Sequence, residues 1–134
     1  MPQPRIGVNV FVRKNGKILM GKRTGGTGEG QWCLPGGKLE FNERLKDCAL
    51  REVFEESGIR LEAVEFVNLN NDPRGHEHWV HVNYQADTSS DPQLTEPERF
   101  TAWDWFSLDE LPEPVFFGHK KLIEAYRCRK IISD

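Results

Sequence analysis

The chain has 134 residues, a formal net charge of −3 at pH 7 and a sequence pI near 5.8. This length suits one domain with a hydrophobic core, so residues 1–134 are predicted to form a single domain. The acidic balance argues against a non-specific nucleic-acid binder, which needs a basic surface. An acidic protein that binds phosphate groups must do so through metal ions and a few placed cations.

No stretch approaches the roughly 18 consecutive apolar residues of a membrane span, and the N-terminus lacks the apolar core of a signal peptide. We therefore expect no membrane association and a cytoplasmic location. The three cysteines show no Cys-x-x-Cys spacing and no accompanying histidine cluster. They are interpreted as inert thiols in a reducing compartment.

The first part of the chain is predicted to form a β-hairpin. Apolar residues alternate over residues 5–13, and a turn containing Asn15 leads into a return strand over residues 17–22. The glycine-rich residues 23–31 follow without the Gly-Lys-Ser/Thr ending of a P-loop. This segment is interpreted as a connector, and the alternative is a lid over substrate.

The next predicted element is a helix over residues 43–57, with Asn42 as its N-cap and Gly58 as its C-terminal stop. At helical spacing, one apolar stripe is made of Leu45, Cys48, Ala49 and Val53. The same projection places Glu52 and Glu56 near the middle of this stripe. These two carboxylates are therefore expected to face the interior of the protein.

Glu55 lies toward the edge of the stripe, beside Arg51. Carboxylates crowded on an inward-facing surface repel one another and resist desolvation unless protonation or a cation relieves them. Oxygen ligands without a nearby His or Cys favour Mg²⁺, or Mn²⁺, over Zn²⁺. The alternative is a solvated helix face with Glu/Arg pairs, and helix geometry alone leaves both interpretations open.

The second half of the chain is predicted to contain three strands and a helix. The strands cover residues 61–70, 77–87 and 100–106, with a turn at 71–75. Residues 122–129 lie in a final amphipathic helix, which is predicted to begin near Pro114. Alternation in the second of these strands gives it a polar and aromatic face, made of Trp79, His81 and Asn83. Strands on both sides of a helix predict an α/β fold, an α/β/α sandwich with a mixed β-sheet.

One motif spans the central helix. From Gly37, five residues lead to Glu43, and seven more lead to the run Arg51-Glu52-Val53-Phe54-Glu55-Glu56-Ser57-Gly58-Ile59. This pattern resembles the Nudix box at every defined position, and the preceding residues 32–37, WCLPGG, also resemble that family. The resemblance implies a hydrolase of diphosphate linkages in nucleoside diphosphates joined to another group, and it implies the same sandwich fold.

The resemblance also implies roles for individual residues. The implied metal ligands are the backbone carbonyl of Gly37 and the carboxylates of Glu52, Glu55 and Glu56. Glu52, oriented by Arg51, is the expected general base, and Glu98 is the other candidate for that role. Glu43 is expected to lie behind the metal ligands, or to join the metal network through water.

Substrate contacts are predicted on both sides of the box. Gly36 lets the backbone approach phosphates closely, and Lys22 and Arg23 are candidate phosphate ligands, with an ordinary surface pair as the alternative. In the MutT-like branch of the Nudix family, which the chain resembles, an aromatic-aromatic-glycine segment near the last helix contacts the base. The matching residues here are Phe116, Phe117, Gly118 and His119, whose aromatic members could instead belong to the core.

Outside the box the chain is similar to MutT-like nucleoside triphosphate diphosphatases, through Gly21-Lys22-Arg23, Trp103-Asp104-Trp105 and Leu111-Pro112. We therefore predict a Mg²⁺-dependent hydrolase that converts a (deoxy)nucleoside triphosphate to monophosphate and pyrophosphate, with a role in sanitising the nucleotide pool. One alternative is an ADP-ribose or other nucleoside-diphosphate-sugar pyrophosphatase, for which Pro73 is a weak indication. Another is a catalytically silent nucleotide sensor, which the complete set of box carboxylates disfavours. Homodimers are common in the resembling branch.

Overall fold

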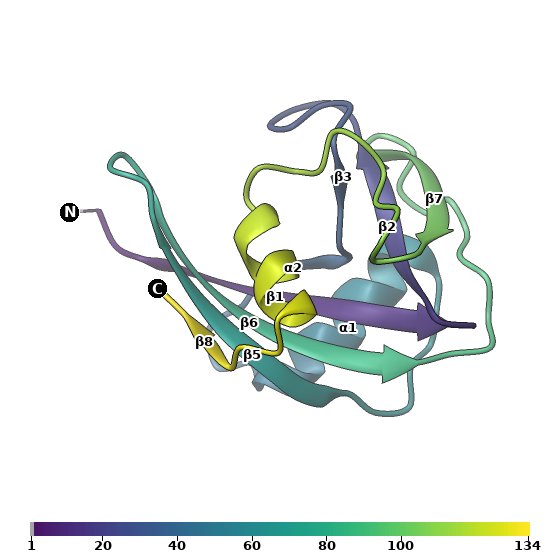
Figure 1. Ribbon diagram of the computed structural model, residues 1–134, viewed down its shortest axis with the longest axis horizontal. Coiled ribbons are helices and arrows are strands. Elements are labelled where there is room, and N and C mark those ends of the chain that lie inside the picture. The colour runs from purple at the N-terminus through teal and green to yellow at the C-terminus, as the bar shows by residue number, and fades with distance from the viewer. Residues whose placement is uncertain (1) are drawn as a thin grey trace.

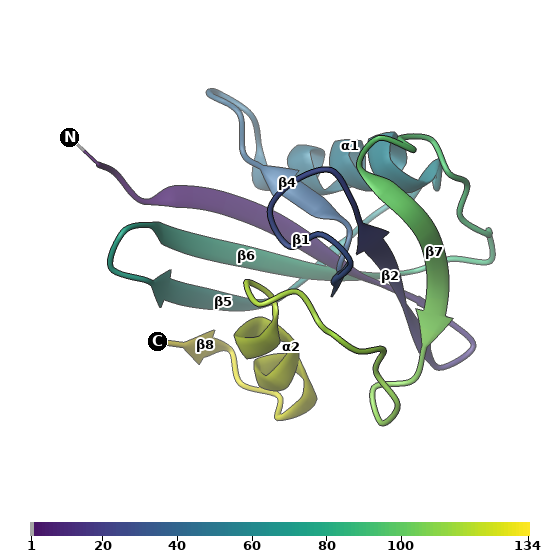
Figure 2. The same cartoon turned by 90° about the horizontal axis from the view of Figure 1, so that it is seen from above.

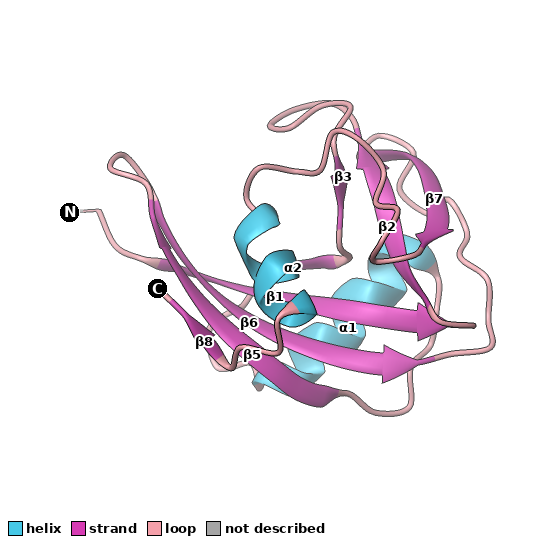
Figure 3. Cartoon of the chain, viewed as in Figure 1, coloured by secondary structure: helices cyan, strands magenta, loops and turns pink. Residues whose placement is uncertain are grey.

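The first strand, β1 (Arg5–Lys14), runs through the middle of the protein and carries side chains for both faces of the sheet. The computed structural model describes residues 2–134, whose elements are shown in Figures 1 and 3. In chain order they continue as β2 (Lys17–Arg23), β3 (Trp32–Cys33), β4 (Gly36–Lys38), α1 (Leu45–Ser57), β5 (Glu65–Pro73), β6 (His78–Asp87), β7 (Phe100–Phe106), α2 (Lys120–Arg127) and β8 (Ile132–Ser133).

All eight strands belong to one mixed sheet. The order is β3-β2-β1-β6-β5-β8, with β4 paired to β1 and β7 paired to β2. The β1/β6 and β5/β8 pairs are parallel and the other pairs are antiparallel. The two helices cover opposite faces of this sheet, as Figures 1 and 2 show. The prediction of an α/β/α sandwich with a mixed sheet is thus confirmed.

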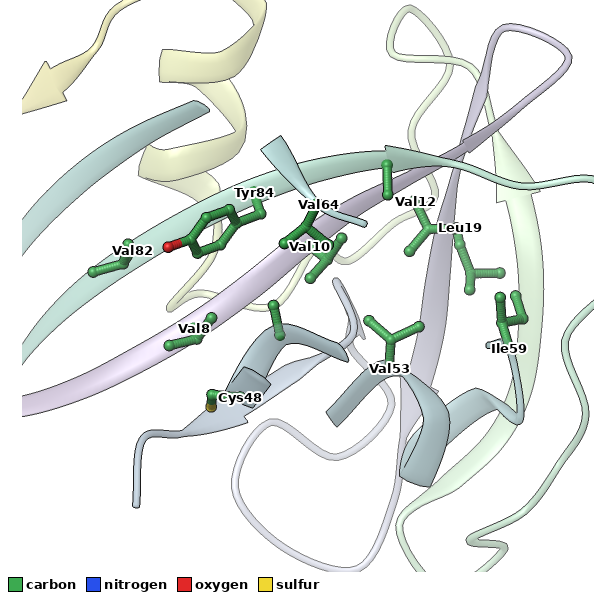
Figure 4. Packing of buried hydrophobic residues seen from close by; sticks show 12 residues of the cluster. Val8, Val10, Val12, Leu19, Cys48, Val53, Ile59, Val64, Val82 and Tyr84 are labelled. Atoms are coloured by element: carbon green, nitrogen blue, oxygen red, sulfur yellow. The ribbon is translucent and has the colours of Figure 1, made fainter. Parts of the chain in front are cut away.

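The core on the α1 side follows from strict alternation in β1. Val8, Val10 and Val12 are fully buried there, together with Val53 of α1. Across the parallel β1/β6 pair, Val10 lies opposite Tyr84, and both belong to the buried cluster between the sheet and α1 that Figure 4 shows. Each buried valine contributes about 1.5–3 kcal/mol of transfer free energy. This packing holds α1 firmly against the sheet.

The opposite face of the same strands is unusually polar. Asn9 of β1 and Asn83 of β6 are buried opposite each other. The Asn9 amide donates to the Asn83 side-chain oxygen at 3.1 Å, and the Asn83 amide donates to Asn68 of β5 at 2.7 Å. His81 lies on this face as well. The polar and aromatic face predicted for residues 77–87 is therefore confirmed, and it is turned inward.

The predicted start of the central helix is wrong by two residues. The helix begins at Leu45 after Arg44, which makes no side-chain capping bond. Asn42 has a left-handed φ of 64° and is not the N-cap. The expected stop is confirmed, because Gly58 has a φ of 74° and its N–H donates to Phe54 O.

Other boundaries differ from the prediction as well, and long-range contacts decide two of them. Strand β5 extends to Pro73, so the hairpin turns later, where the Arg74 N–H donates to Glu77 O at 2.8 Å. The last helix begins at Lys120 and not near Pro114. Trp32 exchanges backbone hydrogen bonds with residues 114 and 116, which holds that segment extended beside β3. Within residues 2–134, no helix has the length and apolar character required to cross a membrane.

Candidate active site

Arg51 on α1 gathers three of the box carboxylates. Its Nε and Nη2 groups donate to the two oxygens of Glu43 at 2.7 and 3.0 Å. Its Nη1 group donates to Glu52 and to Glu55, each at 2.8 Å. Hydrogen bonds from Arg51 lower the pKa of Glu43 to about 2. The planar guanidinium fork therefore fixes the direction of three acids, which an ammonium group could not do.

Glu52 and Glu56 are buried on the inner side of α1, as their place in the apolar stripe predicted. Their exposed fractions are 8% and 1%. The Gly36 N–H donates to Glu56 at 2.9 Å, and an Arg99 nitrogen lies 3.5 Å from its other oxygen. Burial nevertheless raises the pKa of Glu56 to about 8 and raises that of Glu52. Both carboxylates are thus short of positive charge in their ionised form.

The two glycines of β4 allow the backbone to lie directly on these acids. A Cβ atom at Gly37 would lie 2.4 Å from the carboxyl carbon of Glu52, and one at Gly36 would lie 2.3 Å from the Val8 carbonyl oxygen. Any side chain at either position would displace a neighbour. The Gly37 backbone and the Glu52 carboxylate are in this way held in contact.

Within residues 2–134, no three His, Cys, Asp or Glu side chains converge closely enough to form a ready metal site. The donor set nevertheless fits a hard divalent cation, because every candidate ligand is an oxygen. Two of the carboxylates, Glu52 and Glu56, are buried with raised pKa values. A cation would supply the charge that they lack. The Gly37 contact leaves no side chain between the backbone and the Glu52 oxygens.

The predicted alternative base, Glu98, lies exposed in the turn before β7. Its side chain makes no ion pair in the part of the chain that the structure describes. The neighbouring Arg99 is the residue of this turn that reaches the cluster, through Glu56 at 3.5 Å; its second ion pair, with Glu96 at 3.4 Å, is local. The sequence carried no signal for Arg99, because its position depends on how β7 pairs with β2.

A cleft of about 350 Å³ opens on the polar face of the sheet and reaches the carboxylate cluster at Gly37. Its aromatic lining residues are Trp79, Phe116 and Phe117, and its arginines are Arg5, Arg23, Arg74 and Arg99. A nucleotide needs both features, because bases stack on aromatic rings and phosphates pair with guanidinium groups. We call this hollow the nucleotide cleft.

The predicted substrate residues fall into two groups. Arg23, Phe117, Gly118 and His119 line the cleft. Lys22 is exposed and lies outside its lining, because it alternates with Arg23 along β2, and Gly36 faces Glu56 instead. His119 is 5% exposed, and its Nδ1 accepts the Leu34 N–H at 3.1 Å. It therefore belongs to the floor of the cleft.

Arg74 was missed by the sequence interpretation. Its Nε donates to Asp72 at 2.7 Å, its Nη2 donates to the Phe117 carbonyl at 2.8 Å, and its guanidinium lies 4.9 Å from the Phe117 ring centroid. On the other side, the guanidinium of Arg23 lies 4.0 Å from the ring of Phe116. We call Phe116 and Phe117 the aromatic wall of the cleft. Arg23 and Arg74 pack against its two ends, and only the tertiary structure brings these arginines there.

The NUDIX domain family matches residues 1–126. The chain belongs to this family. A crystal structure of a MutT NUDIX hydrolase from Burkholderia pseudomallei superposes with a TM-score of 0.84 and 36% identity, covering 91% of this chain and 97% of that chain. The ADP-ribose pyrophosphatase of Methanocaldococcus jannaschii is 28% identical over 92% of this chain and 73% of its own length. The oxidized purine nucleoside triphosphate hydrolase of Mus musculus is 29% identical over 84% of this chain and 72% of its own.

Family membership confirms the resemblance seen in the box and the expectation of an enzyme. This Nudix chain is a hydrolase acting on pyrophosphate bonds of nucleotides. Nudix hydrolases generally use divalent cations and small nucleotide substrates. The two named relatives act on different substrates, so the choice between those substrates depends on the site itself.

Proposed function

We propose that this Nudix protein is a Mg²⁺-dependent hydrolase that converts a nucleoside triphosphate to its monophosphate and pyrophosphate. One observation carries the proposal: the aromatic and arginine-lined cleft meets the box carboxylates at Gly37. A base stacked against Phe117 would direct its phosphates toward Glu52 and Glu56. Sanitising the nucleotide pool is the cellular role that this activity would serve.

The expected metal ligands are the Gly37 carbonyl and the carboxylates of Glu52, Glu55 and Glu56. When bound, Mg²⁺ neutralises phosphate charge and lowers the pKa of the attacking water. The three carboxylates lie within two turns of α1, Glu52 and Glu56 on its buried side and Glu55 on its exposed edge, and binding of the cation would draw them together. Arg51 keeps Glu52 and Glu55 close to each other through its Nη1 group.

Glu52 is the proposed general base. Arg51 holds its carboxylate at 2.8 Å, and burial raises its pKa, which makes the carboxylate a stronger base than an exposed glutamate. Glu43 acts through Arg51, whose guanidinium it holds with both oxygens. Glu98 is the competing candidate. Glu98→Gln is expected to retain most of kcat, whereas Glu52→Gln is not.

The test is a substrate panel with product analysis by ³¹P NMR. Canonical, oxidised and methylated nucleoside triphosphates are compared with the corresponding diphosphates in Mg²⁺, and again after chelation with EDTA. We expect monophosphate and pyrophosphate in equal amounts, and no turnover in EDTA. Release of orthophosphate alone, or turnover only of a nucleotide sugar, would reject the proposal.

A nucleoside-diphosphate-sugar pyrophosphatase is the second candidate, favoured by the relative from Methanocaldococcus jannaschii. Its indication in the sequence, Pro73, ends β5 as an exposed residue and does not line the nucleotide cleft. ADP-ribose in the same panel decides between the two. The oligomeric state is a separate prediction, and light scattering at several protein concentrations would test for the homodimer.

A further inference from the structure

The glycine-rich residues 24–31, between β2 and β3, form a closed and ordered loop. Arg23 closes its base, because the Arg23 N–H donates to Gln31 O at 2.8 Å and the Arg23 carbonyl accepts from the Gly30 N–H at 2.7 Å. Within the loop, the Gln31 N–H donates to Gly28 O at 3.0 Å. These hydrogen bonds hold the backbone in a fixed path. We call residues 24–31 the glycine loop.

The glycine loop lies against the segment before α2, which carries the aromatic wall (Figure 1). Gln31 binds the backbone of Phe117, since its side-chain oxygen accepts the Phe117 N–H at 3.0 Å. The carbonyl of Trp32, the next residue, accepts the Phe116 N–H at 2.7 Å, and its N–H donates to Pro114 O at 2.9 Å. The backbone of both wall residues is thus tied to the end of the loop.

The ring of Phe116 is packed between two glycines. A Cβ atom at Gly28 would lie 2.6 Å from two ring carbons of Phe116, and one at Gly118 would lie 2.8 Å from a third. The guanidinium of Arg23 lies 4.0 Å from the ring centroid, and its Nε donates to the Thr27 carbonyl at 3.0 Å. A methyl group at Gly28 would therefore displace the ring, and the neighbours at Gly118 and Arg23 limit how it can move.

Displacement of Phe116 would also disturb Phe117. The centroids of the two rings lie 4.7 Å apart, with an angle of 50° between the ring planes. Both rings line the nucleotide cleft, together with Thr27 of the glycine loop. Because stacking on a base depends on the distance and angle of the rings, the support behind Phe116 affects how well a base fits.

We propose that the glycine loop is an ordered support for the aromatic wall, with Gly28 and Gln31 as positioning residues for the nucleotide base. The inference rests on the proposed function, because it assigns the residues that place the base for that reaction. This role differs from both sequence interpretations of the segment, a connector or a lid. The contacts of the loop are with the wall, and the box carboxylates lie on α1, so both residues should affect binding and not the chemical step.

The first experiment compares Gly28→Ala with Gly30→Ala. Both glycines have a left-handed φ, 72° and 81°, so alanine strains the backbone to a similar extent at either position. A Cβ at Gly28 meets Phe116, whereas one at Gly30 meets no atom of residues 2–134 within 4 Å. We expect Gly28→Ala to raise KM for the best triphosphate at least about 10-fold, with kcat within about 3-fold of the wild type. Gly30→Ala should keep KM within about 2-fold.

Gln31 provides a second variant, which decides the proposal if alanine at Gly28 prevents folding. Gln31→Met keeps the length of the side chain but removes the acceptor of the Phe117 N–H, so KM should rise about 5-fold. Gln31→Glu retains an acceptor and should restore KM. The proposal is overturned if Gln31→Glu is impaired as much as Gln31→Met. It is also overturned if Gly28→Ala and Gly30→Ala raise KM equally, or if kcat falls while KM stays unchanged.

Binding of GMP and of AMP, followed by NMR titration in excess Mg²⁺, measures base binding without turnover. Gly28→Ala should weaken binding at least about 10-fold, whereas Gly30→Ala should not. This result without triphosphate turnover by the wild type overturns only the proposed function. Triphosphate turnover with equal binding of GMP and AMP by the two glycine variants overturns this inference alone. A wild type that binds neither monophosphate also overturns the inference, because the wall would then hold no base.

Discussion

The carboxylate cluster and the nucleotide cleft meet at Gly37, yet they are assembled in opposite ways. The cluster comes almost entirely from α1, where acids on successive turns share one guanidinium. The cleft takes its walls from β1, β2 and the loop after it, β4, the β5/β6 hairpin, the turn before β7 and the segment before α2. A site built on one helix is set by the helical period, whereas a site built from many separate segments is set by sheet register. The following predictions test how independent the two regions are.

Loss of one cluster acid should have the largest effect. Glu52→Gln keeps the size of the side chain but removes the base and a metal ligand, so kcat should fall by about 10³-fold or more. Steady-state kinetics on the best triphosphate provide the measurement. Glu62→Gln, an exposed acid outside the site, is the control. Retention of more than a tenth of kcat by Glu52→Gln would remove Glu52 from the mechanism.

Replacing Arg51, whose guanidinium the three acids share, should have the second largest effect on activity. Arg51→Lys retains the charge but cannot hold Glu43, Glu52 and Glu55 at once, so we expect kcat to fall about 10²-fold while KM changes little. The exposed Arg60→Lys is the control. If KM rises and kcat does not fall, Arg51 contacts substrate and does not act by directing the acids.

A change in the aromatic wall should affect KM and leave kcat nearly unchanged, the reverse of the pattern expected for Arg51→Lys. Phe117→Ala removes a stacking surface in the cleft, so KM should rise about 10-fold, with kcat within a few-fold of the wild type. Phe66→Ala, a half-exposed phenylalanine on β5, serves as the control. A fall in kcat equal to the rise in KM would mean that the cleft and the cluster are coupled more tightly than their separate construction suggests.

The smallest effects are on stability. The carboxylate cluster and the cleft should contribute slopes of opposite sign to the dependence of stability on pH. The pKa of Glu56 is raised to about 8 by burial, so the folded protein holds its proton longer than the unfolded chain does, and without metal the stability falls as pH rises from about 4.5 to 8. The pKa of His81 is lowered to about 4 by burial, so its contribution is present above pH 6.5 and is lost as pH falls toward 4. Urea unfolding in EDTA at several pH values measures both slopes.

Each slope has its own variant. Glu56→Gln should remove the loss of stability toward pH 8, and His81→Gln should reduce the loss toward pH 4, each leaving the other slope in place. Added Mg²⁺ should stabilise the wild type most at high pH, where Glu56 is ionised. If both variants changed the stability over the same pH range, the two regions would not be electrostatically separate.

Much of the cluster could be predicted from the sequence, because its members lie within one helix. The burial of Glu52 and Glu56 followed from their projection onto the apolar stripe, and the structure confirms it. The N-terminal end of that helix could not be read in the same way. Glu43 points to Arg51 instead of continuing the helix, and its neighbour Asn42 adopts a left-handed conformation.

The cleft was only partly predictable. The polar and aromatic alternation of β6 and the aromatic pair before the last helix both carried a signal. Arg74 and Arg99 carried none, since each sits in or beside a turn of unremarkable composition. Their roles depend on contacts to Phe117 and Glu56, both more than 40 residues away in the chain.

By itself, the order of residues determined the sandwich and the acids that turn inward from the central helix, because a period of 3.6 or 2 residues acts over a few neighbours. The family followed from the spaced residues of the box. Only the folded chain decided which arginines complete the site and which of Lys22 and Arg23 faces it. The physical reason is register. A shift of one residue in a strand moves every side chain to the other face, and that choice is made by packing across the whole sheet.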